Sequence, residues 1–281
     1  MTARLTRFTS EGMTFDVQDS GPPDGPVVVA LHGFPQTSAS WAGVVPPLVA
    51  AGYRVLAPNQ RGYSAGARPP DVASYAVARL VGDVLALADA AGAERFHVLG
   101  HDWGAAVAWA LAGGHADRVA TLTAVSVPHP AAMARALAGS QALRSWYMVL
   151  FQVPGLAERL FRVRGGALTR RLLAGTGMPD PGPSVRMLAD PASATGPLSW
   201  YRALRLPGGL RTGRTAVPTL HVWSDRDTAL GRRAAEGTAA HVDGPYRFVV
   251  LRGVSHWVPE ERPAELAALL LEHLAAHPLD R

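Results

Sequence analysis

The sequence contains no cysteine and no lysine. Without cysteine the chain cannot form disulfides, cysteine metal sites or a thiol nucleophile, so the chemistry of cysteine hydrolases is excluded. No apolar run approaches the roughly 18 residues needed to cross a bilayer, and residues 1–7 lack the hydrophobic region of a signal peptide. We therefore expect no membrane partner and, as the default, a cytoplasmic protein.

Charge is also sparse, because only 17% of the residues are charged while 48% are hydrophobic. This composition is typical of a folded globular protein and argues against long disordered stretches. The length of 281 residues exceeds that of a typical domain, roughly 100 to 200 residues. It suits one α/β core with an inserted subdomain.

All 27 basic residues are arginines, and they are unevenly distributed. Residues 131–214 contain twelve arginines and three acidic residues, so this segment carries +9 and the rest of the chain −4, which together give the net charge of +5. A basic segment can bind nucleic acid, but no helix-turn-helix or aromatic-interleaved pattern accompanies these arginines. We interpret them as the coat of a helical surface and expect no nucleic-acid partner.

Hydrophobic runs alternate with helix-like stretches along most of the chain. Residues 27–31 are a continuous apolar run followed by His32-Gly33, which predicts a strand buried on both faces. Similar runs occupy residues 53–57, 96–99, 119–125, 219–223 and 248–251, and helix-like stretches occupy 40–51, 75–91, 105–113, 232–241 and 263–277. This alternation predicts a mostly parallel sheet with helices on both faces. Residues 4–8 and 14–18 predict a short antiparallel edge, which makes eight strands.

The alternation stops between residues 130 and 214, where arginine-rich helical pieces are separated by proline and glycine turns. We predict a helical cap over 130–214, inserted between a first core part, 1–129, and a second core part, 215–281. The stretch 175–197 is short and rich in glycine and proline, so the sequence leaves the shape of the cap open.

Asp102 occupies a turn between a predicted strand and a predicted helix. Gly100 and Gly104 lie two residues before and two residues after it. Small residues at these positions permit the strained nucleophile elbow of an α/β-hydrolase, which raises the nucleophile above the sheet. The alternative is that Asp102 only caps the following helix.

The loop after the first buried strand reads His32-Gly33-Phe34-Pro35. In this architecture that loop supplies one N–H of the oxyanion hole, and the residue after the nucleophile supplies the other. The predicted donors are therefore the backbone groups of Phe34 and Trp103. We assign His32, Gly33, Pro35 and Trp103 to the substrate-binding surface, although an ordinary turn would also explain a His-Gly pair.

His256 follows a late predicted strand, and Asp225 and Asp227 follow the strand before it. The order nucleophile, acid, histidine is the one that this fold uses. Either aspartate could orient His256. The agreement of all these motifs in order favours a catalytic site over scattered surface residues.

An aspartate nucleophile restricts the reaction. Attack by a carboxylate on an ester carbonyl would form a high-energy anhydride, whereas attack on an electrophilic sp³ carbon forms a stable ester. The substrate should therefore be an alkylating agent. Asp102 is ionised near neutral pH, so His256 remains free to deprotonate water for hydrolysis of the ester.

With these motifs the sequence resembles, over nearly its whole length, the epoxide hydrolases of the α/β-hydrolase fold, with haloalkane dehalogenases as close relatives. The resemblance implies that Asp227, third after Ser224, is the acid. Residues 145–158 resemble the cap segment that carries the first epoxide-binding tyrosine, here Tyr147, and residues 198–202 resemble the segment that carries the second, here Tyr201. Both would otherwise be assigned to the core of the cap.

The tyrosine pair suits an epoxide, because two phenols can bind its oxygen and one can protonate the alkoxide as the ring opens. Dehalogenases usually have asparagine where this chain has Phe34. The sequence thus predicts an epoxide hydrolase with an epoxide and water as substrates, and leaves a dehalogenase and a non-catalytic binding module as alternative functions. It also leaves open whether the protein forms a homodimer. We expect no cofactor and no metal, since ligand-spaced clusters are lacking; His101 is interpreted as packing beside the nucleophile and His129 as a loop residue.

Overall fold

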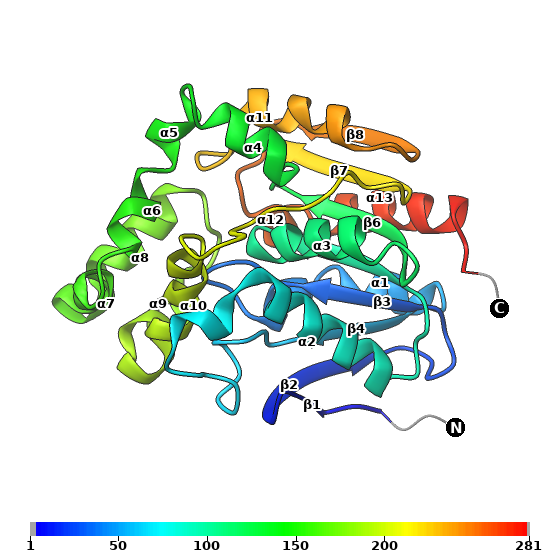
Figure 1. Ribbon diagram of the computed structural model, residues 1–281, viewed down its shortest axis with the longest axis horizontal. Helices are drawn as coiled ribbons and strands as arrows, with labels where there is room; N and C mark the ends of the chain where they lie inside the picture. The colour runs from blue at the N-terminus through cyan, green and yellow to red at the C-terminus, as the bar shows by residue number, and fades with distance from the viewer. Residues whose placement is uncertain (1–3, 280–281) are drawn as a thin grey trace.

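The computed structural model describes residues 4–279, which form an eight-stranded sheet flanked by helices (Figure 1). The strand order is β1-β2-β4-β3-β5-β6-β7-β8; the pairs β1–β2 and β2–β4 are antiparallel, and all the other pairs are parallel. The strands are β1 Arg7–Ser10, β2 Met13–Ser20, β3 Val27–Leu31, β4 Arg54–Pro58, β5 Phe96–His101, β6 Val119–Val125, β7 Thr219–Ser224 and β8 Tyr246–Leu251. The predicted fold class is confirmed.

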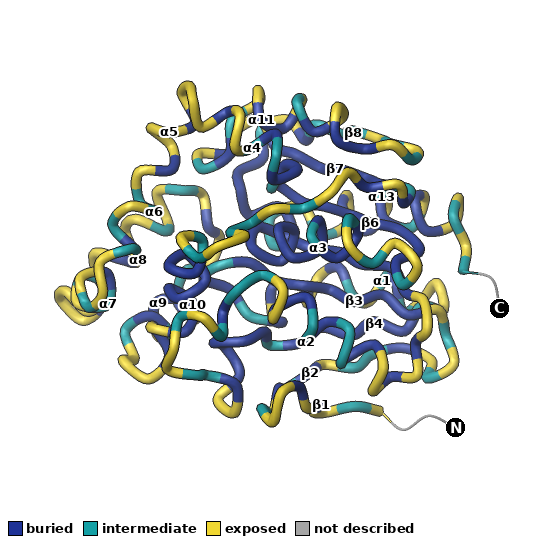
Figure 2. Tube along the Cα trace, in the orientation of Figure 1, coloured by how far each residue is buried: buried dark blue, intermediate teal, exposed yellow. Residues whose placement is uncertain are grey.

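Burial explains why the central strands are visible in the sequence. Every residue of β3 to β7 is buried, so these strands are mostly apolar, although β4 to β7 also bury some polar side chains (Figure 2). Strand β1 lies at the edge and alternates between exposed and buried residues. The prediction of a first strand at 4–8 was wrong by about three residues, because Phe8 stacks on Phe15 at 4.8 Å and sets the register that continues to Ser10.

Helices cover both faces of the sheet. On one face α2 and α3 pack against Val29, Leu31 and Val98; on the other, α1 and α13 pack against Val28 and Leu99. The helices of the core are η1 Ser38–Trp41, α1 Val45–Ala50, η2 Val72–Tyr75, α2 Val77–Ala90, α3 Trp103–Gly114, α11 Arg232–Glu236, η4 Gly237–His241, α12 Val258–Glu261 and α13 Pro263–Ala276. Adjacent strand residues point to opposite faces, so helices on both faces favour apolar residues at successive strand positions.

Two predicted helices are each split into two. Residues 40–51 form η1 and α1, because Pro46 and Pro47 lack the N–H groups that a continuous helix would need and fit the first turn of α1. Residues 232–241 form α11 and η4, with the break at Gly237.

A cluster of short helices lies between β6 and β7 in the chain and gathers at one end of the sheet (Figure 1). They are α4 Pro130–Ala136, α5 Gln141–Arg144, α6 Trp146–Phe151, α7 Leu156–Arg162, η3 Val163–Gly166, α8 Ala167–Gly175, α9 Gly182–Ala189 and α10 Pro191–Ala203. The glycine- and proline-rich stretch 175–197, whose structure the sequence left open, contains α9 and the first half of α10. Asp190 starts α10 by accepting a hydrogen bond from the Ala192 N–H.

Helix α10 packs closely on the core. A Cβ built on Gly196 would lie 2.6 Å from the Cα of Gly62, so only glycine fits on both sides of this contact. The indole Nε1 of Trp200 donates to the carbonyl oxygen of Arg61 at 2.8 Å. These contacts fix α10 against the loop that follows β4. Among the helices of residues 4–279, none is both long and apolar enough to span a bilayer.

Candidate active site

Asp102 lies in a strained turn between β5 and α3. Its backbone has φ 50° and ψ −122°, a conformation rare for a residue with a side chain. A Cβ on Gly100 would lie 2.4 Å from the carbonyl oxygen of Gly104, and a Cβ on Gly104 would lie 2.0 Å from that of Leu31. The two glycines therefore permit this sharp turn. The Asp102 side chain makes no capping hydrogen bond to α3, so helix capping does not explain its position.

The loop after β3 contacts the Asp102 carboxylate directly. The Phe34 N–H donates to Asp102 Oδ1 at 2.8 Å. A Cβ on Gly33 would lie 2.4 Å from the Cβ of Asp102, so glycine allows the two segments to approach. Trp103, the other predicted donor, begins α3 and is buried with its ring 5.0 Å from that of Tyr201. Of the two predicted oxyanion residues, Phe34 thus contacts the Asp102 carboxylate through its N–H, and Trp103 follows Asp102 directly in the chain.

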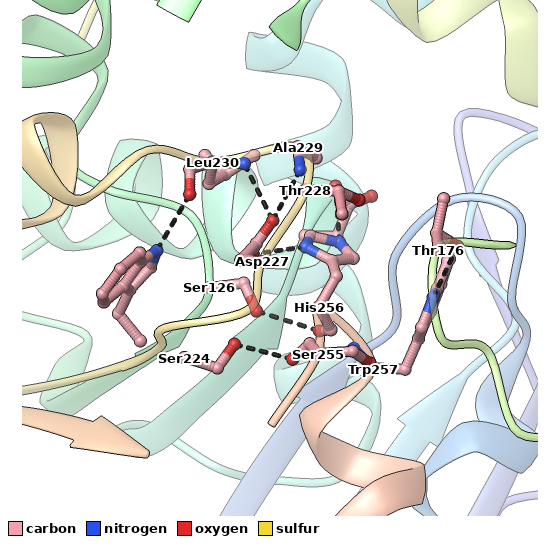
Figure 3. Close-up of polar contacts among 12 residues, drawn as sticks. Ser126, Thr176, Ser224, Asp227, Thr228, Ala229, Leu230, Ser255, His256 and Trp257 are labelled. Carbon is pink, nitrogen blue, oxygen red and sulfur yellow. Dashed lines mark hydrogen bonds and ion pairs between the residues drawn. The ribbon is translucent and has the colours of Figure 1, made fainter. Parts of the chain in front are cut away.

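His256 lies between two aspartates. Its Nδ1 is 2.7 Å from Asp227 Oδ2 (Figure 3). Its Nε2 is 3.6 Å from Asp102 Oδ2. The other oxygen of Asp227 accepts hydrogen bonds from the backbone N–H groups of Ala229 and Leu230, both at 2.8 Å. Asp225 points elsewhere, since its carboxylate accepts from the Gly253 N–H at 2.7 Å on the exposed surface. Of the two aspartates left open by the sequence, only Asp227 contacts His256.

The two carboxylates control the charge of His256. Burial by itself would lower the pKa of His256, but Asp227 and Asp102 outweigh burial and raise this pKa to about 10. The pKa of Asp102 is lowered, because His256 outweighs the raising effect of burial. The free protein therefore holds an Asp102 carboxylate beside a protonated His256 at neutral pH.

Three side chains hold the loop that carries His256, and two of them were missed in the sequence. Ser126 Oγ donates to the carbonyl oxygen of His256 at 3.1 Å, and Ser224 Oγ donates to that of Ser255 at 2.6 Å (Figure 3). The ring of His101 also contacts the His256 carbonyl oxygen, with Nε2 at 2.9 Å. Ser126 comes directly after β6, and Ser224 is the last residue of β7. Their position at the ends of strands was the only feature of the sequence that could have pointed to them.

The structure brings Tyr147 and Tyr201 together over the nucleophile loop. Their ring centroids are 6.1 Å apart, and the Tyr201 ring lies 5.3 Å from that of Phe34. Tyr147 comes from α6 and Tyr201 from α10. Burial raises the pKa of both phenols, and the negative charge of Asp102 raises them further. Both phenols therefore remain protonated donors at neutral pH.

Hydrogen bonds from side chains to backbone carbonyls tie the end of α6 to α10 beside this pair. Gln152 Nε2 donates to the carbonyl oxygen of Tyr201 at 2.8 Å, and Arg202 Nε donates to that of Phe151 at 3.0 Å. Arg202 is itself buried and paired with Glu158 at 2.9 Å. Nothing in the sequence singled out these three polar residues, because each forms its contact across two helices far apart in the chain.

His32 contacts the backbone on both sides. Its Nδ1 lies 3.0 Å from the Gly33 carbonyl oxygen, and its Nε2 accepts from the Gln60 N–H at 3.2 Å. Burial lowers its pKa to about 4, so the ring is neutral. The ring is fully buried, which gives His32 a clear role in holding the loop. Pro35 is buried in the same loop, whereas Phe34 before it is partly exposed.

The remaining histidines near the site do not form a metal centre. His129, interpreted from the sequence as a loop residue, caps α4 by accepting from the Ala131 N–H and is buried. Within the described part of the chain, residues 4–279, no three His, Asp or Glu side chains are grouped so that they could hold a metal ion.

Comparison with known proteins places this geometry in a family. The model of the α/β-hydrolase fold family matches residues 26–263. The chain belongs to the α/β-hydrolase fold family. Within this α/β-hydrolase family it is 36% identical to epoxide hydrolase A of Mycobacterium tuberculosis, with 94% of this chain and 95% of that protein covered. It is 34% identical to AB hydrolase superfamily protein YfhM of Bacillus subtilis, over 94% of this chain and 96% of that protein.

Solved structures of α/β-hydrolases lead to the same group. The crystal structure of epoxide hydrolase A from Mycobacterium thermoresistibile superimposes with a TM-score of 0.84 at 31% identity and covers 98% of each chain. This α/β-hydrolase is thus similar, in sequence and in fold, to proteins named epoxide hydrolases.

Proposed function

We propose that this α/β-hydrolase is an epoxide hydrolase, which converts an epoxide and water to a vicinal diol through an ester on Asp102. The observation that carries the proposal is the grouping of two protonated phenols near Asp102, whose charge raises the pKa of both. The names of the relatives agree with it. A small-molecule epoxide is the substrate that this combination of groups fits.

In the first half-reaction, Asp102 Oδ attacks one ring carbon and the bond between that carbon and the epoxide oxygen breaks. Tyr147 and Tyr201 hydrogen-bond to the oxygen, and one of them transfers its proton to the forming alkoxide. The products are an alkyl ester on Asp102 and a neighbouring hydroxyl group. Phe34 N–H already hydrogen-bonds to Asp102 Oδ1, which leaves Oδ2 available for the attack.

In the second half-reaction, His256 takes a proton from water, and the hydroxide adds to the carbonyl carbon of the Asp102 ester. The N–H groups of Phe34 and Trp103 stabilise the tetrahedral oxyanion. The intermediate collapses with release of the diol and return of the Asp102 carboxylate. Asp227 stabilises the imidazolium that forms on His256.

The charge of His256 fits this sequence of steps. Ester formation removes the negative charge of Asp102, one of the two charges that raise the pKa of His256. The pKa therefore falls, and the proton of His256 can replace the one that the tyrosine donated. Neutral His256 is then the base required for hydrolysis, and deprotonation of water restores the initial imidazolium–carboxylate pair.

The experiment is to trap the ester. We expect His256→Gln to keep the nucleophile and lose the base, so incubation with styrene oxide should add one substrate mass to the protein. Peptide mapping should place that mass on Asp102. The double variant Asp102→Asn, His256→Gln is the matched control and should remain unmodified. Absence of the adduct in His256→Gln, with substrate binding demonstrated, would contradict the ester mechanism.

A hydrolytic dehalogenase would share Asp102, Asp227 and His256, so the leaving group must be tested separately. A halide needs no proton, whereas an epoxide oxygen does. We expect diol formation from terminal or styrene-type epoxides and no halide release from chloro- or bromoalkanes. Halide release without diol formation would favour the dehalogenase, and neither product, with binding retained, would favour a non-catalytic binding module.

A further inference from the structure

The outer surface of the cap is apolar in a way that the active site does not explain. All the large hydrophobic side chains that residues 4–279 leave exposed lie between positions 137 and 172. They are Leu137, Leu143, Trp146, Val149, Val153, Leu156, Val163, Leu168 and Leu172. Large exposed apolar patches on a folded protein usually mark an interaction site.

Four of these residues form a stripe along α5, α6 and the turn after α6. Leu143, Trp146, Val149 and Val153 are spaced by three, three and four residues, which places them on one face of a helical segment. Their exposed fractions are 80%, 62%, 70% and 48%. We call these four residues the cap stripe. The segment lies at the outer edge of the molecule, where Figure 2 shows exposed chain.

The opposite face of the same segment carries Tyr147 and Phe151, which pack against the ring of Tyr201. Helix α6 is therefore apolar all round, although only one side is covered by the protein. A helix of this kind is stable when both faces are removed from water. The cap stripe needs a cover that the described chain does not provide.

The charge near the cap stripe indicates that the partner covering it is anionic. Seven arginines between positions 135 and 171 are exposed: Arg135, Arg144, Arg159, Arg162, Arg164, Arg170 and Arg171. None of the seven forms an ion pair with a carboxylate within the described residues. The only acidic residue in that stretch is Glu158, which is paired with Arg202.

We propose that the cap docks peripherally on an anionic lipid surface, with the cap stripe inserted at the headgroup boundary and the arginines on the lipid phosphates. Exposed tryptophan, aliphatic side chains and arginine on one short helical region are the combination that lies in such an interface. A second copy of the chain is a poorer cover, because a two-fold contact would bring the same arginine-rich face against itself. This proposal departs from the expectation of no membrane partner, which was argued only from the lack of an apolar run long enough to span a bilayer and of a signal peptide.

Docking of the cap would orient the active site at the membrane surface, since α6 carries the cap stripe outside and Tyr147 inside. An apolar epoxide concentrates in the bilayer and would meet the enzyme there. This use of the surface rests on the proposed function, whereas the docking itself does not.

The test is co-sedimentation of the full chain with vesicles of phosphatidylcholine mixed with phosphatidylglycerol, against vesicles of phosphatidylcholine alone. We expect binding to the anionic vesicles that weakens as salt rises. Trp146→Ser with Val149→Ser should weaken binding by at least about tenfold, because two apolar side chains no longer leave water. Arg159→Gln with Arg162→Gln should weaken it by about fivefold for each charge removed.

The matched control is Arg95→Gln with Arg252→Gln, which removes the same charge from exposed positions outside the cap. It should retain much more of the binding than the cap arginine pair. Circular dichroism and turnover of a water-dissolved epoxide without vesicles should stay unchanged in Trp146→Ser, Val149→Ser, so a folding defect is recognised. That turnover also separates failure of docking from failure of the proposed function.

Three results would overturn the docking proposal. The first is no binding to anionic vesicles. The second is equal binding by wild type and the cap variants. The third is a stable dimer in light scattering that Trp146→Ser, Val149→Ser converts to a monomer, which would identify a second copy as the cover.

Discussion

In the core, Asp102, Asp227 and His256 stand on turns that follow β5, β7 and β8, whereas in the cap Tyr147 and Tyr201 stand on short helices. The core residues are held by backbone N–H and carbonyl groups at the ends of buried strands. The tyrosines depend on contacts between helices that are themselves partly exposed. The sheet therefore determines where the three core residues lie, because they stand at strand ends. The positions of the two tyrosines depend instead on how the short helices of the cap pack against one another.

The two regions also differ in charge. The core site is a buried cluster of two carboxylates and one imidazolium, in which each charge has a partner. The cap surface carries arginines without carboxylate partners. Removal of a charge should therefore matter far more in the core than on the cap, except where the cap meets another surface.

The largest effect should come from the nucleophile. Asp102→Asn keeps the shape of the side chain but cannot attack an epoxide, so diol formation should fall by at least about 10⁴-fold. Single-turnover measurement of ester formation is the assay. Activity within tenfold of wild type would require a mechanism without the Asp102 ester. It would contradict the proposal that the core supplies the nucleophile and the cap supplies the acid.

The same variant tests the charge relation in the core. Without the negative charge of Asp102, the pKa of His256 should fall from about 10 toward its ordinary value. A raised pKa in the folded state contributes stability below the ordinary pKa, and that contribution is lost as pH rises toward 10. NMR titration of the His256 ring in both proteins measures the change. An unchanged pKa would show that Asp102 does not hold the proton on His256.

The next effect separates the two aspartates after β7. Asp227→Asn should reduce hydrolysis of the ester by about 10³- to 10⁴-fold, because the imidazolium of His256 loses its charge partner and its tautomer is disturbed. Asp225→Asn is the matched control and should be mild, since an amide oxygen can still accept from Gly253 N–H. Rapid-quench measurement of ester decay resolves this step. The reverse ranking would move the acid to Asp225.

The phenols of the cap should contribute less individually than the core aspartates. General-acid help is typically worth roughly 10²- to 10⁴-fold, so Tyr147→Phe or Tyr201→Phe should slow ester formation toward the lower end of this range. The double variant should be nearly inactive, although the effects need not add because one phenol can partly replace the other. If the double variant formed the ester at the wild-type rate, the two cap tyrosines would have no part in opening the epoxide ring.

The core could be predicted from the sequence for a physical reason. Strands buried on both faces are mostly apolar, and a turn as sharp as that at Asp102 needs glycine at positions 100 and 104. Both requirements leave a local pattern of residues. The order of Asp102, Asp227 and His256 then follows the strand ends. The polar contacts that hold the His256 loop left no such pattern, because Ser126 and Ser224 look like ordinary strand-end residues.

The cap could be predicted only in outline. Its helical character and arginine content were visible, but the pairing of Arg202 with Glu158 and the contact of Gly196 with Gly62 join segments far apart in the chain. Tyr147 and Tyr201 were recognised through resemblance to a family and not through their spacing. The exposed cap stripe was also hidden, because α6 is apolar on both faces.

The difference between regions extends to stability. Gly104→Ala would place a methyl group 2.0 Å from the carbonyl oxygen of Leu31, where neither backbone segment can yield easily. We expect a loss of about 3 kcal/mol of unfolding free energy or more, which corresponds to a fall of roughly 6 °C or more in melting temperature. Calorimetry measures it. A stability within 1 °C of wild type would show that the elbow is not tightly packed.

The smallest effects should come from two glycines of the cap that lie two residues apart. Gly175 ends α8 with ordinary helical geometry and nothing within 4 Å of an added methyl group, so Gly175→Ala should change the melting temperature by less than about 2 °C. Gly177 has φ +91°, and its methyl group would lie 2.6 Å from the Cβ of Ser255, next to His256. Gly177→Ala should cost about 1 to 2 kcal/mol and slow turnover as well, because the strain falls on the loop that carries the base. Equal effects of the two changes would mean that the cap is as loosely packed beside His256 as it is at its surface.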